Sequence, residues 1–292
     1  MGVWSAAFVR LSAALLLGAT GCASLDLGPA SQPMAATEAM LTNPLFPSNH
    51  RNWDPNLAVL PQAEMVGDQI TVHNVRNTTY ITETDFIVRH YNKTFKMSDV
   101  CSVDYCLVPF NDSRALAHTF LSFGLTNGEY LAVSIEVRLE ADEEYSPVMG
   151  SLRQFEIMYV VADERDVVLL RTEHRNCDVF IYPTKATPTQ AQAVLRDLLD
   201  RVNELVVQPE FYDSLTNNCT TNIMRPLNKH MPQRLTYDYR MLLPGYSAQL
   251  AYDAGLLDTQ FSYVEATTRA RVTDRAHRYK DDPDFSRKIR GY

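Results

Sequence analysis

The chain has 292 residues, of which 27 are Lys or Arg and 35 are Asp or Glu, so its formal net charge is −8. This acidic balance gives no indication of a nucleic-acid partner or of a polybasic patch that binds membranes. Hydrophobic residues make up 46% of the chain, which suffices for the core of one large domain over residues 49–292.

The chain begins with a segment typical of a lipoprotein of a diderm bacterium. Arg10 precedes an apolar run over residues 11–17. The run is shorter than the roughly 20 residues that span a bilayer, so it predicts a signal peptide. Ala19-Thr20-Gly21-Cys22 then resembles a lipobox. We therefore expect residues 1–21 to be removed and Cys22 to carry lipid, in the periplasm and on the outer membrane. An ordinary signal peptide cleaved near Cys22 is the alternative.

The next segment, residues 22–48, is rich in Pro, Ala, Ser and Thr and has no apolar period, which predicts a flexible tether. Short extended segments dominate from about Trp53 onwards. The clearest are residues 115–123 and 130–139, whose alternation predicts a hairpin. Further strands are predicted over residues 70–75, 79–88, 103–110, 155–162, 166–171 and 177–182.

Two helices follow the strands. Thr187-Pro188-Thr189-Gln190 has the spacing of a capping box with Pro at the first helical position, and an apolar stripe continues to Leu205. A second helix is expected to begin at Asn218-Cys219 and to end before Pro226. Strands first and helices later predict an α+β fold, with an antiparallel sheet and packed helices.

Cys219 is the candidate nucleophile. Asn218 is a good N-cap residue, so it places Cys219 in the first helical turn, where N–H groups and the helix dipole stabilise a thiolate. The Cys219 N–H would serve as an oxyanion donor, and Tyr212 or Asn218 would add a side-chain donor. The alternative is that Cys219 packs as a small hydrophobe. In an oxidising compartment Cys101 and Cys106 could form a disulfide, and the sequence does not decide this. At least one thiol is expected to be free.

His118 is the candidate base. If Thr126-Asn127-Gly128 is a three-residue hairpin loop, His118 lies opposite Glu136. Glu136 would then accept the Nδ1 proton of His118 and leave Nε2 directed at Cys219. A two-residue loop would instead place His118 opposite Val137.

Five segments resemble the family named for the Lnb N-terminal periplasmic domain, and the resemblance covers about residues 49–292. The most specific is Asn217-Asn218-Cys219-Thr220-Thr221-Asn222. Lnb is similar to enzymes that move an acyl chain from phospholipid to the terminal amine of a lipoprotein. The resemblance implies a circularly permuted papain-like (NlpC-type) thiol fold, in which the histidine strand precedes the cysteine helix. The five segments are residues 74–77, 117–124, 160–166, 211–222 and 282–286.

The leading hypothesis is a thiol acyltransferase or acyl hydrolase that acts on phospholipid or lipoprotein through a Cys219 thioester, with His118 moving the proton and Glu136 orienting the ring. A cell-wall amidase or peptidase, and a non-catalytic module that binds lipid or a partner, are the alternatives. An apolar cleft would favour the first, a polar groove the second, and a His118 unable to approach Cys219 the third. No cofactor is expected, and no zinc, because His and Cys lack the ligand spacings.

Overall fold

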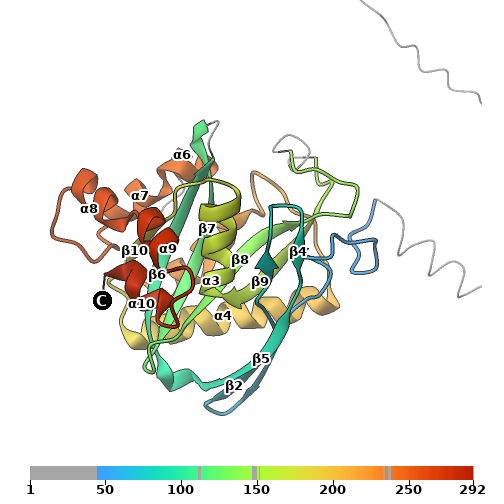
Figure 1. Cartoon of the computed structure of the whole chain (residues 1–292), viewed down its shortest axis with the longest axis horizontal. Coiled ribbons are helices and arrows are strands. Elements are labelled where there is room, and N and C mark those ends of the chain that lie inside the picture. Colours follow the sequence, from blue (N-terminus) through green and yellow to red (C-terminus); the bar gives the residue numbers. More distant parts are fainter. Residues whose placement is uncertain are drawn as a thin grey trace, which may run out of the picture.

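The computed structural model describes residues 45–110, 113–146, 150, 152–232, 234–235 and 238–291 (Figure 1). The predicted signal peptide, the predicted lipidation residue Cys22 and most of the predicted tether therefore lie outside the described residues.

A mostly antiparallel sheet forms the centre of the molecule. In the described part of the chain its eight strands have the order β1-β2-β9-β8-β7-β6-β10, with β5 paired to β2 beside this path. The pair β2–β9 is parallel. The strands are β1 (Gln62–Val66), β2 (Gln69–Arg76), β5 (His90–Lys96), β6 (Val100–Phe110), β7 (Ser113–Leu125), β8 (Tyr130–Arg138), β9 (Glu156–Asp163) and β10 (Phe180–Pro183).

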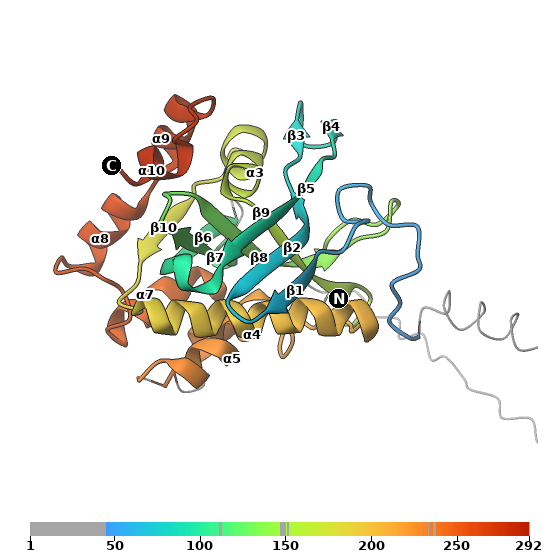
Figure 2. The ribbon, with the colours of Figure 1, turned by 90° about the horizontal axis from the view of Figure 1, so that it is seen from below.

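Helices cover both faces of this sheet, as Figure 2 shows with α4 and α5 on one side and α3 on the other. The larger core lies between the sheet and α4, α5 and α7. The smaller core lies between the sheet and α3, α9 and α10. The helices are α3 (Glu164–Leu169), α4 (Pro188–Val207), α5 (Cys219–His230), α6 (Tyr239–Leu242), α7 (Ser247–Asp253), α8 (Tyr263–Ala270), α9 (Thr273–Tyr279) and α10 (Phe285–Arg290), with short turns η1 (Met97–Asp99), η2 (Leu170–His174) and η3 (Pro244–Tyr246).

The predicted α+β class, the predicted start of α4 and the three-residue hairpin loop are confirmed. Thr187 forms the capping box with Gln190 at the start of α4. Gly128 has a φ of +85°, and its N–H donates to Leu125 at 2.9 Å. Glycine suits this left-handed position because it has no Cβ.

The pairing of β7 with β8 ends before either strand does. Its last pair is Phe120 with Ser134. Beyond that point β7 stays paired with β6, and β8 stays paired with β9 as far as Arg138. The sheet therefore splits between β7 and β8, and groups from both of its faces can reach the split.

Two of the predicted strands are wrong. Residues 79–88 form a separate hairpin of two short strands, β3 (Thr79–Tyr80) and β4 (Phe86–Ile87). Residues 166–171 are helical, in α3 and the π-helical turn η2. The Asp163 side chain caps α3 by accepting from the Arg165 N–H at 3.0 Å. The buried charges of Asp166 and Arg171 both find partners, and this tertiary pairing outweighs local β-propensity.

The predicted end of α5 before Pro226 is also wrong, because the helix continues to His230. Pro226 removes one helical hydrogen bond. Its ring is buried, and Leu227 and Met231 beyond it pack against the larger core. Met231 also donates its N–H to Leu227 at 2.8 Å. Packing therefore maintains the helix past the proline.

The disulfide that the sequence left open does not form, since Cys101 and Cys106 are both free thiols on β6. Residues five apart along a strand point to opposite faces. Their Cα atoms are separated by about 16 Å at the usual rise per residue, which is beyond the reach of a disulfide.

Candidate active site

Cys219 is the first residue of α5 and is 5% exposed. A capping box holds the helix start: the Thr221 N–H donates to Asn218 Oδ1 at 2.9 Å, and the Asn218 N–H donates to Thr221 Oγ1 at 3.0 Å. Asn218 Nδ2 donates to the Ser214 carbonyl at 2.8 Å. The Asn218 side chain thus fixes the position of Cys219 in the first turn, where backbone N–H groups have no intrahelical partner.

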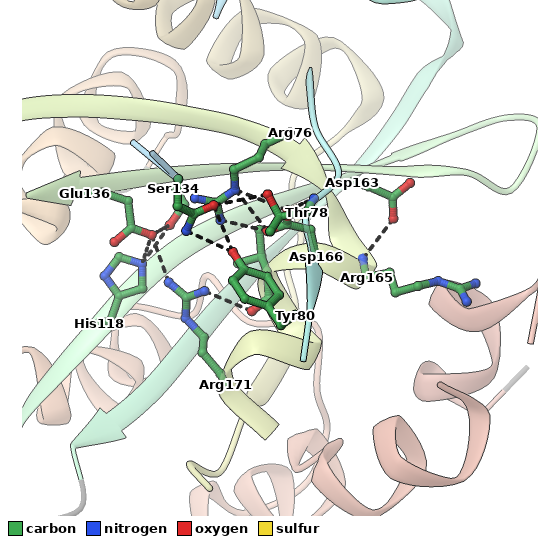
Figure 3. A network of polar contacts seen from close by, with 12 residues as sticks. Arg76, Thr78, Tyr80, His118, Ser134, Glu136, Asp163, Arg165, Asp166 and Arg171 are labelled. Carbon is green, nitrogen blue, oxygen red and sulfur yellow. Dashed lines mark hydrogen bonds and ion pairs between the residues drawn. The ribbon is translucent and has the colours of Figure 1, made fainter. Parts of the chain in front are cut away.

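His118 lies on β7, and its side chain lines the same cavity as Cys219 and lowers the pKa of that thiol. Its Nε2 lies 2.7 Å from Ser134 Oγ and 3.3 Å from Glu136 Oε1 (Figure 3). The side chains of His118 and Glu136 therefore meet as predicted, although the pairing of β7 with β8 ends two residues earlier, at Phe120 and Ser134. β7 contributes the base, and β8 contributes the carboxylate.

The nitrogen assignment made from the sequence is wrong, because Nε2 and not Nδ1 faces Glu136. Nε2 already contacts Ser134 and Glu136, so the other ring nitrogen remains for Cys219. Nδ1 is the ring nitrogen nearer the backbone of its own residue. Nδ1 of His118 is accordingly the nitrogen available to Cys219.

Glu136 has two further partners that hold its carboxylate in place. Ser134 Oγ donates to Glu136 Oε1 at 2.6 Å, and Arg171 Nη2 donates to the same oxygen at 2.8 Å. Arg171 is 3% exposed and also donates to the Val167 carbonyl at 2.9 Å. The carboxylate is thus charge-paired on both sides, by His118 and by Arg171, as a buried charge requires.

A second buried ion pair supports the first. Arg76 at the end of β2 contacts Asp166 of α3 through its Nη2 at 2.7 Å, and the Thr78 N–H donates to Asp166 at 2.7 Å (Figure 3). Since η2 follows α3 directly, this pair anchors the helix from which Arg171 reaches Glu136. The pair also joins two of the segments on which the family resemblance rests, residues 74–77 and 160–166.

The electrostatics of the site favour an ionised thiol. Burial alone would raise the pKa of Cys219, but its hydrogen bond with His118 and the charge of the imidazolium outweigh burial and lower the pKa to about 7. Burial would lower the pKa of His118, but the charge of Glu136 outweighs it and the net shift is upward. Burial would raise the pKa of Glu136, but the charges of His118 and Arg171 hold it well below the usual range. A thiolate–imidazolium pair is therefore stable near neutral pH.

A cavity of about 310 Å³ opens over these groups. Side chains from both faces of the sheet reach it because β7 and β8 are not paired here. One wall is polar and includes Glu83 and Arg175. Tyr212 also lines this cavity, is 7% exposed and is hydrogen-bonded to Tyr145. The structure thus brings together all five site residues predicted within the domain: His118, Glu136, Tyr212, Asn218 and Cys219.

An apolar cavity of about 200 Å³ adjoins the site between β6, α5 and α7. Thr220, the residue after Cys219, lines it, and so do Tyr105 and Ser247, whose hydroxyl oxygens are 2.6 Å apart. The remaining wall is mainly aliphatic and includes Val103, Leu121, Ile223, Met224, Leu227 and Leu250. Neighbouring residues at the start of α5 therefore line two different cavities: Cys219 lines the larger one and Thr220 lines the apolar one.

Sequence reasoning missed three polar residues of this site. Ser134 shares a strand face with Glu136, and that alternation was the signal that could have identified it. Arg171 was placed on a strand, so its approach to Glu136 was not foreseen. Arg76 carried no signal of its own, because only the fold brings β2 next to α3.

An α+β domain with a Cys–His pair and a partly buried supporting carboxylate is the class that this fold and site define. The family described as Lnb N-terminal periplasmic domain matches residues 88–245, more than half of the chain. The chain belongs to this family of periplasmic domains, and the matched range includes His118, Glu136 and Cys219. Searches of curated proteins and of solved structures found no significant match.

Within the described ranges, no helix has the length and apolar character needed to cross a membrane. The same residues contain no group of His, Cys, Asp and Glu side chains arranged to hold a metal ion.

Proposed function

We propose that this protein is an envelope lipoprotein that transfers or hydrolyses acyl groups of phospholipids or lipoproteins through a thioester on Cys219. The observation that carries the proposal is the Cys219–His118 pair in the wall of one cavity, with the next residue of α5, Thr220, in the wall of a second, apolar cavity. The order of the histidine strand before the cysteine helix supports a circularly permuted papain-like arrangement. Lipid on Cys22 would hold the domain at the outer membrane.

The chemistry follows from the pair. The Cys219 thiolate attacks the acyl carbonyl carbon, the C–O bond of the ester breaks, and the leaving alcohol takes a proton from His118. An amine or water then attacks the thioester and gives its proton to His118, and the C–S bond breaks to regenerate the thiolate. Glu136 stays ionised throughout and stabilises the imidazolium.

The tetrahedral oxyanion needs donors near Cys219. The N–H of Cys219 itself is available at the helix start, and the positive end of the α5 dipole lies there. The Tyr212 hydroxyl is the candidate side-chain donor, because Tyr212 lines the same cavity as the thiol. Asn218 contributes indirectly, by holding the first turn of α5 in place.

The two cavities match the two parts of an amphipathic substrate. The apolar cavity suits a hydrocarbon chain, since ligand pockets for such groups are lined mainly by aliphatic side chains. The larger cavity is lined mainly by apolar side chains, but one part of its wall carries Glu83, Arg171 and Arg175, and this part suits the polar part of the substrate. This division favours an acyl donor over a wholly polar substrate.

A second candidate is an amidase or peptidase acting on cell-wall peptides, which the polar wall of the larger cavity favours. The same thioester chemistry would apply, with an amide as donor. The third candidate, a non-catalytic binding module, is disfavoured because His118 reaches Cys219.

Intact-protein mass spectrometry after incubation with phospholipid tests the proposal. An added acyl mass on Cys219, absent in Cys219→Ala and strongly reduced in His118→Ala, is expected. Cys106→Ala is the matched control, because Cys106 is a fully buried thiol whose pKa burial raises well above its usual range. Cleavage of a cell-wall peptide without any lipid adduct would favour the amidase instead. No adduct with either substrate class would reject thiol catalysis.

A further inference from the structure

The Ser134 hydroxyl lies between the imidazole of His118 and the carboxylate of Glu136. Its Oγ is 2.7 Å from His118 Nε2 and 2.6 Å from Glu136 Oε1. The direct separation of His118 Nε2 from Glu136 Oε1 is 3.3 Å, longer than an ordinary N–H···O bond. The two short contacts, from His118 and from Glu136, are thus both made with the Ser134 hydroxyl. We propose that Ser134 is a positioning residue that couples the base to its carboxylate, an inference that rests on the proposed function.

The proton positions follow from what each group can donate. An ionised carboxylate only accepts, so the Ser134 hydroxyl donates its hydrogen to Glu136. The Ser134 oxygen then accepts from a hydrogen on His118 Nε2. With the proton on Nε2, the lone pair of the neutral ring is on Nδ1, the nitrogen available to Cys219. Ser134 therefore selects the tautomer of His118 that can take a proton from the thiol.

The position of Ser134 suits this role. It forms the last pair of the β7–β8 ladder, with Phe120, so its backbone is fixed at the point where the sheet splits. It is fully buried, and its hydroxyl alone connects the His118 ring to the Glu136 carboxylate through two hydrogen bonds. His118 and Glu136 both lie two residues beyond this pair, one on each strand.

The sheet contains a matched control in Ser122 of β7. This residue is also fully buried, donates to the carboxylate of Glu164, and that carboxylate is bound by Arg290 at 2.6 Å. Ser122 thus repeats the serine–carboxylate–arginine arrangement without a histidine. Loss of the Ser122 hydroxyl should disturb stability in the same way as loss of the Ser134 hydroxyl, but it should not affect Cys219.

The experiment measures the rate of Cys219 alkylation by iodoacetamide against pH, resolved by peptide, in the full-length protein. For Ser134→Ala we expect the profile to move to higher pH by half a unit to one unit, so that the rate at pH 7 falls about 2- to 6-fold. Ser134→Thr keeps a hydroxyl and a good strand former, and should stay within about twofold of wild type. Ser122→Ala should leave the profile unchanged.

A Ser134→Ala profile that superimposes on wild type would overturn the role of Ser134, and so would an equal shift in Ser122→Ala. If Ser134→Ala does not fold, nitrogen-15 NMR of the wild-type His118 ring decides, at a pH high enough for the ring to be neutral: a proton on Nδ1 overturns the proposal, and a proton on Nε2 supports it. These failures differ from failure of the proposed function, in which wild-type Cys219 itself would alkylate like an ordinary thiol.

Discussion

The apolar cavity beside Cys219 predicts how the reaction rate depends on acyl-chain length. The cavity measures about 200 Å³, and a methylene group takes up about 30 Å³, similar to the share of a water molecule in the liquid. The cavity therefore holds about six or seven carbons. Each buried methylene contributes about 0.8 kcal/mol, which corresponds to roughly a fourfold gain in kcat/KM per carbon. We expect kcat/KM to rise with chain length to about this limit and then level off.

The assay is release of p-nitrophenol from esters of increasing acyl length. Ala251 of α7 lines the cavity and is 8% exposed, so Ala251→Leu would fill about three carbons of it. The plateau should then begin about three carbons earlier. Ala266→Leu on α8 is the matched control, because Ala266 is 7% exposed and does not line the cavity, while overpacking there carries a similar penalty. A flat wild-type profile, or the same change in both variants, would refute the assignment of the cavity.

Four further predictions concern the charges and the anchor. His118→Gln should return the pKa of Cys219 from about 7 to 9.0 or above, so its iodoacetamide alkylation at pH 7 should fall about 50-fold; an unreactive wild-type Cys219 would contradict this. Glu136→Gln should lower turnover about 10- to 100-fold, His118→Ala should lower it more, and the double variant should add little, whereas multiplicative losses would argue against coupling. The pKa of Glu136 is lower in the folded protein than in the unfolded chain, so its ionised carboxylate stabilises the fold fully above about pH 4.5, and this contribution is lost as the pH falls through the pKa of the folded state. Thermal melts of Glu136→Gln should therefore be less acid-sensitive than those of wild type. Cys22→Ala should abolish labelling with a fatty-acid analogue while the domain still folds, and unchanged labelling would reject the lipid anchor.

Local signals in the sequence were enough for much of the fold. The hairpin register followed from the loop that Gly128 favours, and the start of α4 followed from the Thr187 capping box. These features depend on residues close together in the chain. The register alone then placed His118 beside Glu136, because pairing across a hairpin is fixed once its loop is known.

The errors arose where distant residues decide the local structure. The run around Val167 reads as a strand, but the buried pairs of Asp166 and Arg171 with partners on other elements favour a helix. Pro226 reads as a helix end, but packing beyond it keeps α5 helical. The nitrogen of His118 that faces Glu136 could not be derived either, since it depends on the side from which α5 brings Cys219.

The split between β7 and β8 makes the alignment of His118 with Glu136 sensitive to small rotations of either strand. His118 and Glu136 each lie two residues from the last pair, about 7 Å along their strands at the usual rise. A rotation of one strand about that pair by about 10° would move its side chain by roughly 1 Å, a misplacement that can lower a catalytic rate about 100-fold. Each strand is also held on its outer side, because His118 pairs with Val108 of β6 and Glu136 pairs with Met158 of β9. Alignment of the base with its carboxylate therefore depends on these two pairings as well as on the Phe120–Ser134 pair. Substitutions that weaken these pairings would lower the catalytic rate while the rest of the sheet stays folded.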